Sequence, residues 1–217
     1  MVQIAASMLG ADWLNFGAEI AKGDAAGADR WQIDIADGHF APTITYGEEL
    51  VRRCKQASKL PIEIHLMVTN PRAWFKMMAD IGVEMVVFHA EAAPDLHETI
   101  MACKKHGLKV GVALNHDTDI AVLLPELAHI DQITLMGIIT GWSGQKMIPA
   151  TVDRAAALSK AIKAGGYKII LQVDGGVNME TAPALAKAGV TGVVTSAYLF
   201  RATDPAQALQ DLRKVFA

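Results

Sequence analysis

Four acidic or imidazole side chains have a spacing that suits proton transfer or metal binding. Polar and apolar residues alternate in four runs, "RWQIDIAD" (30–37), "IEIHLMV" (62–68), "MVVFHA" (85–90) and "KIILQVDGG" (168–176), and this alternation is typical of β-strands. Successive side chains of a strand point to opposite faces, so the polar members of each run share one face. Nearest the C-terminal ends of the runs, that face carries Asp34, His65, His89 and Asp174.

Two carboxylates that meet at one site can transfer protons on the two faces of a bound substrate. Asp34 and Asp174 are the candidates, and His65 suits a metal ligand or an electrophile. A single buried Asp or His is more often a hydrogen-bonded core residue, but four from four strands favour a site. Gln32, Glu63 and Gln172 share the same face, and we expect Glu63 and Gln172 to be hydrogen-bonded fillers one layer deeper. The remaining histidines are expected in surface loops or helices: His39, His97, His106, His116 and His129.

Strand-like runs alternate strictly with amphipathic, alanine-rich stretches along the chain. The runs are 3–7, 30–37, 62–68, 85–90, 109–114, 132–137, 168–176 and 192–197. Among the expected helices are 118–129 and a last one at 204–216. Such alternation implies parallel strands joined by crossover helices, and eight units in 217 residues predict a (β/α)8 TIM barrel as a single domain, 1–217. A doubly wound sheet is the alternative, but the turn after 3–7 lacks GxGxxG.

Composition excludes several classes of protein. A net charge of −3 offers no basic surface for nucleic acid or an anionic membrane. Cys54 and Cys103 have no CxxC spacing, which fits a reducing compartment rather than a disulfide scaffold. The first residues lack the pattern of a secretion signal, and no apolar run reaches membrane-spanning length. We therefore expect a cytoplasmic protein with a small-molecule partner.

Three glycine- or hydroxyl-rich segments follow neighbouring runs: "TGWSGQ" (140–145), "DGGVN" (174–178) and "TSAYLF" (195–200). Backbone N–H groups in such turns bind phosphate, and barrels of this kind use the loops after their last strands for it. Their position on adjacent strands predicts a phosphorylated ligand. Lys146 could add positive charge, although a solvated lysine is the ordinary expectation.

The motifs resemble those of the ribulose-phosphate 3-epimerase family, nearly from end to end. The family has a strand-two motif, His-x-Asp-x-Met-Asp-Gly-x-Phe-x-Pro, and "QIDIADGHFAP" matches it at Asp34, Asp37, Gly38, Phe40 and Pro42. "HLMV" (65–68) and "VDGGVN" (173–178) match its strand-three and strand-seven signatures. "AASML" supplies its strand-one serine, Ser7, and "LN" (114–115), "GQ" (144–145) and "SAYLF" (196–200) fit later segments.

This resemblance implies epimerisation at C3 of a ketose phosphate, namely D-ribulose 5-phosphate/D-xylulose 5-phosphate or a related sugar phosphate. It implies that Asp34 and Asp174 are the two acid/base groups and that Asp34, His65 and Asp174 are ligands of a divalent metal, which stabilises an enediolate. The substrate-binding residues that it implies are Ser7, His65, Met67, Gly141, Trp142, Ser143, Gly144, Gly175, Gly176, Thr195 and Ser196.

The sequence departs from the family pattern at several positions. The first metal ligand, a histidine, is Gln32 here, and an amide oxygen is a poorer zinc ligand than an imidazole. We therefore expect a metal (zinc, manganese, magnesium or iron) to be held weakly or not at all, with oxygen-preferring ions favoured. Ala36 replaces the methionine between the two aspartates, the strand-six loop reads "ITGWSGQ" (139–145), and Thr195 replaces a glycine. The reaction type is thus better supported than the substrate.

Two other functions stay open at this point. An aldose–ketose isomerase would use a similar enediol but move a proton between two carbons. A phosphosugar-binding relative without catalysis is suggested by Gln32 and the altered loop, but both Asp34 and Asp174 are retained. We expect no organic cofactor, and self-association into a homo-oligomer is expected from the resemblance alone.

Overall fold

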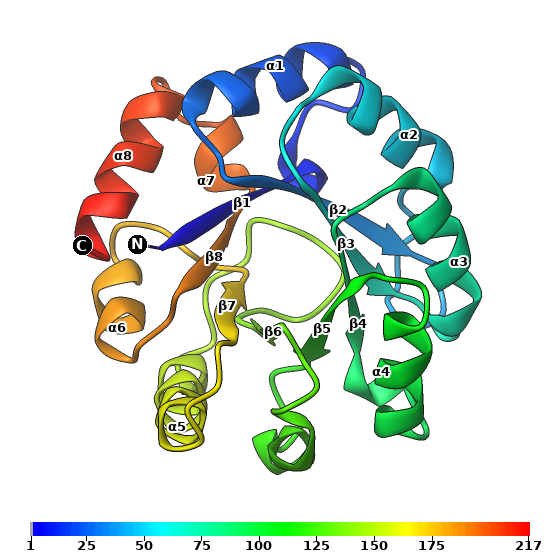
Figure 1. Cartoon of the computed structure of the whole chain (residues 1–217). Coiled ribbons are helices and arrows are strands. Elements are labelled where there is room, and N and C mark those ends of the chain that lie inside the picture. Colours follow the sequence, from blue (N-terminus) through cyan, green and yellow to red (C-terminus); the bar gives the residue numbers. More distant parts are fainter. Residues whose placement is uncertain (1) are drawn as a thin grey trace.

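The computed structural model describes residues 2–217, which form a closed barrel of parallel strands in the order β1 to β8 (Figure 1). The strands are β1 (Gln3–Ser7), β2 (Arg30–Ala36), β3 (Ile62–Met67), β4 (Met85–His89), β5 (Lys109–Leu114), β6 (Gln132–Met136), β7 (Ile170–Asp174) and β8 (Gly192–Thr195). Each strand pairs in parallel with the next, and β8 pairs with β1. The predicted (β/α)8 barrel is confirmed.

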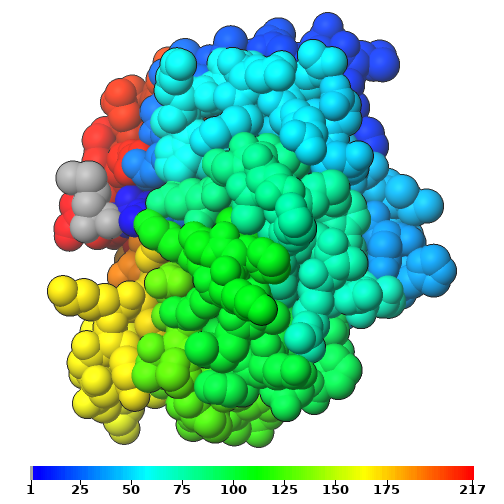
Figure 2. Space-filling model, turned by 45° about the vertical axis from the view of Figure 1, so that its right-hand side comes forward, coloured from blue at the N-terminus to red at the C-terminus, as the bar shows by residue number. Residues whose placement is uncertain are grey.

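Helices form a ring outside the strands (Figure 1). They are α1 (Phe16–Ala26), α2 (Glu48–Ala57), α3 (Arg72–Ile81), α4 (Leu96–Lys104), α5 (Ala150–Ala164), α6 (Ala182–Lys187), α7 (Ala197–Phe200) and α8 (Pro205–Val215). Three short 3₁₀ helices join them: η1 (Met8–Gly10), η2 (Ala90–Ala92) and η3 (Ile120–Glu126). Figure 2 shows the outer surface over α2, α3 and α4, where their side chains cover the barrel without a break. Within residues 2–217, no helix is long and apolar enough to cross a membrane.

The alternation in β2 sorts its side chains as the sequence predicts. Trp31 points outward and packs so closely on α1 that a Cβ added to Gly23 would lie 2.3 Å from its ring. Arg30, on the inner face, donates from Nη1 to Glu63 Oε2 at 3.2 Å. Gln172 of β7 donates to the other oxygen of Glu63 at 2.9 Å. Glu63 and Gln172 are therefore the hydrogen-bonded interior residues that the alternation predicts, in a layer below Asp34.

Most expected strands match to within one residue, and three expected elements differ more. The helix expected over 118–129 is the 3₁₀ helix η3, in which Pro125 has no N–H for an α-helical hydrogen bond. The run 168–176 is a strand only over Ile170–Asp174, because Gly175 and Gly176 turn the chain with φ of 101° and 72°. The run 192–197 ends as a strand at Thr195, and the chain continues as α7.

Candidate active site

A cavity of about 320 Å³ opens at the C-terminal ends of the strands, where barrels of this type carry their sites. It brings together nearly all the predicted catalytic and substrate-binding residues: Ser7, Asp34, His65, Met67, Gly141, Trp142, Ser143, Gly144, Asp174, Gly175, Gly176 and Ser196. Thr195 is not among its lining residues. The Thr195 side chain is buried, and its hydroxyl donates to the backbone oxygen of Ala5 at 3.3 Å.

The two aspartates meet on one amide group. Gln32 Nε2 donates to Asp34 Oδ1 at 2.9 Å and to Asp174 Oδ2 at 2.8 Å. Ser7 Oγ donates to the other oxygen of Asp34, Oδ2, at 2.7 Å. Parallel pairing fixes this arrangement, since Ser7 lies beside Gln32 in the β1–β2 register. Hydrogen bonds thus hold Asp34 at both carboxylate oxygens.

His65 lies beside the same carboxylates. Its Nδ1 is 2.9 Å from Asp34 Oδ1 and 3.5 Å from Asp174 Oδ2. In the β2–β3 register, Asp34 is the direct neighbour of His65. Burial opposes protonation of His65, but the Asp34 hydrogen bond and the surrounding carboxylates outweigh it and raise its pKa. The carboxylates of Asp34 and Asp174 thus favour the protonated form of His65.

The two carboxylates have different environments. Burial first, and then the negative charge of Asp34, raise the pKa of Asp174 to about 7, although His65 and Gln32 act in the opposite direction. The Asp174 side chain is 13 % exposed, against 3 % for Asp34. Asp174 can therefore gain or lose a proton near neutral pH while it still reaches the cavity.

A buried chain of polar groups extends behind His65. His65 Nε2 is 3.0 Å from His89 Nε2, and His89 Nδ1 is 3.3 Å from Glu91 Oε2. Burial lowers the pKa of His89 to about 4, so that its ring is neutral and can accept from His65 while it donates to Glu91. His89, the last residue of β4, lies beside His65 as the alternation predicts, but it is fully buried and does not line the cavity.

The donor set fits a divalent cation. Asp34, His65 and Asp174 each offer a ligand atom, and these atoms lie within 4.8 Å of one another. Carboxylate oxygens and an imidazole nitrogen are ordinary ligands of zinc and manganese. Gln32 Oε1 is buried and has no hydrogen-bond partner within residues 2–217. A flip of the Gln32 amide would direct Oε1 toward the ligand atoms of Asp34 and Asp174. The two hydrogen bonds from Nε2 would then be lost.

Glycine-containing loops after β6 and β7 also line the cavity. Gly141, Gly144, Gly175 and Gly176 all have positive φ, between 72° and 133°. A Cβ on Gly176 would lie 2.5 Å from Met147 Cβ, so that position requires glycine for space as well as conformation. Gln145 stiffens the strand-six loop by donating to the backbone oxygens of Ile139 and Trp142. These loops offer main-chain groups to an anionic part of a ligand.

One cationic side chain in the cavity lining was not found from the sequence. Arg201 directly follows α7 and lines the cavity together with Ser196 and Tyr198. Lys146, which the sequence suggested as a source of charge, is exposed and does not line it. Its position just after the hydroxyl-rich segment 195–200 could have indicated Arg201. The alternation of side chains along a strand could not, because Arg201 lies beyond the end of β8.

Comparisons with known proteins identify sequences related to this chain. The family model described as "Ribulose-phosphate 3 epimerase family" matches residues 3–200. The ribulose-phosphate 3-epimerase of Bacillus subtilis (strain 168) is 35% identical over 214 residues, covering 98% of this chain and 99% of that protein. The enzyme of the same name from Methanocaldococcus jannaschii is 35% identical over 214 residues, covering 99% of this chain and 91% of its own.

Solved structures with low identity share the fold. KGPDC from Streptococcus mutans superposes with a TM-score of 0.70 at 16% identity, covering 100% of this chain and 98% of the other. Orotidine 5'-phosphate decarboxylase from Pyrococcus horikoshii OT3 gives 0.68 at 15% identity, covering 99% of both chains. These likenesses concern the barrel alone. The matching family model and the relatives at 35% identity go further, and they make this chain a member of the ribulose-phosphate 3-epimerase family.

Proposed function

We propose that the protein is a ketose-phosphate 3-epimerase that inverts C3 by proton transfer between two carboxylic groups. The observation that carries the proposal is the pair Asp34 and Asp174, from β2 and β7, which face one cavity and share the Gln32 amide. Family membership supports epimerisation of a sugar phosphate as the reaction type.

The raised pKa of Asp174 suits a division of labour between the two groups. In one direction, Asp34 accepts the C3 proton from one face of the substrate, and Asp174 delivers a proton to the other face. In the reverse direction the two groups exchange roles. The negative charge that remains on the substrate after the first transfer is that of an enediolate, and a hydrogen bond from His65, which lies beside both aspartates, would stabilise it.

Asp34, His65 and Asp174 are the residues that would hold a divalent cation. When bound, such an ion would supply Lewis-acid stabilisation to oxygens next to the reacting carbon. Gln32 offers a neutral amide in place of an imidazole, and its NH₂ group already satisfies both carboxylates. We therefore infer weaker metal binding than with histidine at this position, and a preference for oxygen-seeking ions such as Mg²⁺ or Mn²⁺.

The phosphate of the substrate would lie against the glycine loops. Gly175 and Gly176 have no side chain of their own to hinder an anion that approaches their backbone, and Ser196 and Arg201 add a hydroxyl and a cation to the lining of the cavity. A five-carbon substrate, D-ribulose 5-phosphate or D-xylulose 5-phosphate, is the first candidate, because relatives with 35% identity are named for the former.

Product analysis in D₂O tests this function. The purified protein is incubated with ribulose 5-phosphate, and the products are resolved by NMR. A 3-epimerase forms xylulose 5-phosphate with deuterium at C3 and the carbonyl unmoved. Formation of an aldose phosphate would instead indicate an isomerase, and ligand binding without deuterium incorporation into any ketose phosphate tested would indicate a non-catalytic binding protein.

Two properties of the protein in solution and in the cell follow as further expectations. The two cysteines, Cys54 and Cys103, are free and buried, which fits our proposal of a cytoplasmic location. Self-association is expected from the family resemblance. Size-exclusion chromatography with light scattering checks it, and a mass near that of one 23.2 kDa chain would contradict it.

A further inference from the structure

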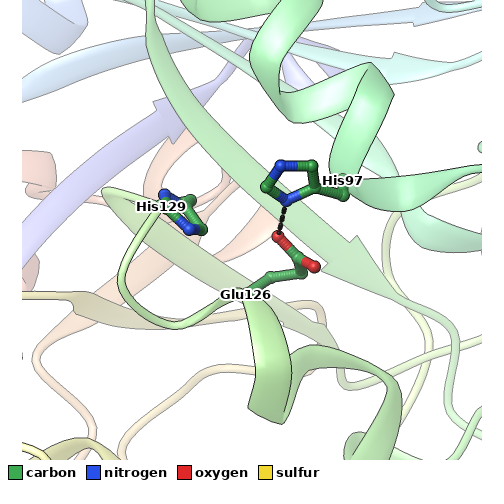
Figure 3. Close-up of side chains that lie close together, drawn as sticks. All are labelled: His97, Glu126 and His129. Atoms are coloured by element: carbon green, nitrogen blue, oxygen red, sulfur yellow. Dashed lines mark hydrogen bonds and ion pairs between the residues drawn. The ribbon is translucent and has the colours of Figure 1, made fainter.

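Two histidines and a glutamate meet on the outer wall of the barrel, away from the cavity. His97 comes from the first turn of α4, Glu126 from the end of η3, and His129 from the segment that leads into β6 (Figure 3). His97 Nδ1 is 2.9 Å from Glu126 Oε2. The His129 ring stands edge-on to that of His97, with centroids 5.2 Å apart. One ligand atom from each residue lies within 4.8 Å of the other two.

The backbone holds these three side chains in place. The N–H of His129 donates to the carbonyl of Glu126 at 2.8 Å, closing a turn that presents both residues on one side. Leu123, Leu127 and Ile130 anchor that turn in the core. Asp95 caps α4 by accepting from Glu98 N at 2.8 Å, which fixes the helical turn carrying His97. The cluster therefore stands on anchored segments.

The environment of Glu126 argues for more than an ordinary surface ion pair. Its side chain is only 12 % exposed, whereas that of His97 is 55 % exposed. Within residues 2–217, its carboxylate has no ion-pair partner other than His97. A mostly covered carboxylate beside two imidazoles is a stronger attractor for a cation than a solvated acid, because less water competes for it. An ion pair between His97 and Glu126 alone would not account for the His129 ring, which stands against that of His97.

We propose that His97, Glu126 and His129 form a surface site for a divalent transition-metal ion, best suited to Zn²⁺. Two imidazole nitrogens and one carboxylate oxygen are a frequent ligand set of zinc, with the remaining tetrahedral position open to water. The harder ions Mg²⁺ and Ca²⁺ prefer all-oxygen sites and would bind poorly here. Binding cross-links α4 to the segment before β6, so that zinc stabilises the folded chain through this site.

Equilibrium dialysis against Zn²⁺, with metal analysis of the retained protein, tests the site on the full chain. His97→Ala and His129→Ala remove one ligand each, and His106→Ala removes an exposed histidine just beyond α4 as the matched control. We expect the wild type and His106→Ala to retain one equivalent more than either ligand variant. The affinity for Zn²⁺ should fall at least about tenfold for each ligand lost. Even the loss of a hydrogen-bond partner of a metal ligand lowers affinity by about 10- to 100-fold.

The candidate active site does not confound this comparison, because its ligands are unchanged in all four proteins. The zinc-dependent rise in Tm is measured in parallel and should shrink in His97→Ala and His129→Ala but not in His106→Ala. Equal zinc retention by all four proteins, or an equal loss in the control, would overturn the proposal. None of these results depends on whether the cavity catalyses epimerisation.

Discussion

Gln32 determines how the two catalytic candidates face each other. Two buried carboxylates repel, and the amide of Gln32 reduces that repulsion by donating one hydrogen bond to each, at 2.9 and 2.8 Å. A histidine at this position would offer a ring nitrogen to a metal ion, but it could not bridge both acids with a single NH₂ group. We therefore propose that Gln32 weakens cation binding at this site and instead holds the two carboxylates together by hydrogen bonds.

Gln32→His should tighten divalent-metal binding at least about tenfold, because even changes to the hydrogen-bond partners of metal ligands alter affinity by about 10- to 100-fold. The measurement is a competition titration with a chelator, carried out in a His97→Ala background so that the surface histidines do not contribute. Gln32→Asn is the matched control, because its shorter amide adds no imidazole. Equal affinities in all three proteins would contradict the role given to Gln32.

Arg201 is the charged residue expected to contact the substrate phosphate. Arg201→Ala should raise KM for a phosphorylated substrate about tenfold with a small change in kcat, since a hydrogen bond between charged groups contributes about 1.5–3 kcal/mol and Arg201 is exposed. Steady-state kinetics on the epimerisation substrate check this. Lys146→Ala is the control and should leave KM unchanged. A KM for Arg201→Ala within twofold of the wild type would remove Arg201 from the phosphate site.

At the scale of elements, the loops that follow the strands are tied together by side chains. Asp37, just after β2, accepts from the N–H groups of His39 and Phe40 on one oxygen and from Thr69 N and Oγ1 on the other. Burial opposes its ionisation, but these four donors outweigh it and lower the pKa of Asp37. The turn after β2 is thereby attached to the loop after β3, next to His65 and Met67.

The stability that Asp37 provides should depend on pH. A lowered pKa means that the ionised carboxylate stabilises the fold fully above its unfolded value of 3.8, and that this contribution is lost as pH falls below it. Asp37→Asn should lower the free energy of unfolding by about 1–2 kcal/mol at pH 7, limited by solvent screening, and by less at pH 3. Urea denaturation at both pH values measures it. Asp117→Asn, at an exposed aspartate, is the control, and a pH-independent difference for Asp37→Asn would contradict the assignment.

The strands could be predicted from the sequence because their polar and apolar residues alternate regularly. Alternation in β2, β3 and β7 was strict enough to orient Gln32, Asp34, His65 and Asp174 correctly, because one-residue shifts would bury the wrong face. The segment 118–129 has apolar residues at helical spacing, yet Pro125 makes it a 3₁₀ helix. Arg201, and the meeting of His97 with His129, lie beyond such reasoning, since they depend on how separate connections pack outside the strands.

At the scale of the whole molecule, a buried polar layer closes the barrel beneath the site. Arg30 at the start of β2 reaches Glu63 of β3, and Gln172 of β7 reaches the same carboxylate. All three are buried, and Arg30 Nε has no partner within the described chain. Removing one member of such a network leaves the other charge without compensation in a poorly solvated interior.

Glu63→Ala should therefore cost about 3–5 kcal/mol of unfolding free energy, the usual effect of breaking a buried ion pair. Glu84→Ala is the matched control, since it breaks the exposed pair of Glu84 with Lys109, 2.7 Å apart, and should cost less than about 1 kcal/mol. Both variants are compared by urea denaturation. If both variants lose a similar, small amount of unfolding free energy, water reaches the Arg30–Glu63 layer and the pair is not isolated from solvent.

The central claim is that Asp34 and Asp174 share the inversion of C3. The most direct test measures epimer formation and deuterium incorporation at C3 in D₂O for the wild type, Asp34→Asn and Asp174→Asn, with circular dichroism confirming that each protein is folded. Each variant should lose inversion by about 10²–10⁴-fold, the usual contribution of a general acid or base, and any remaining exchange should be confined to one epimer. Inversion at near wild-type rate in either variant would contradict the two-base mechanism.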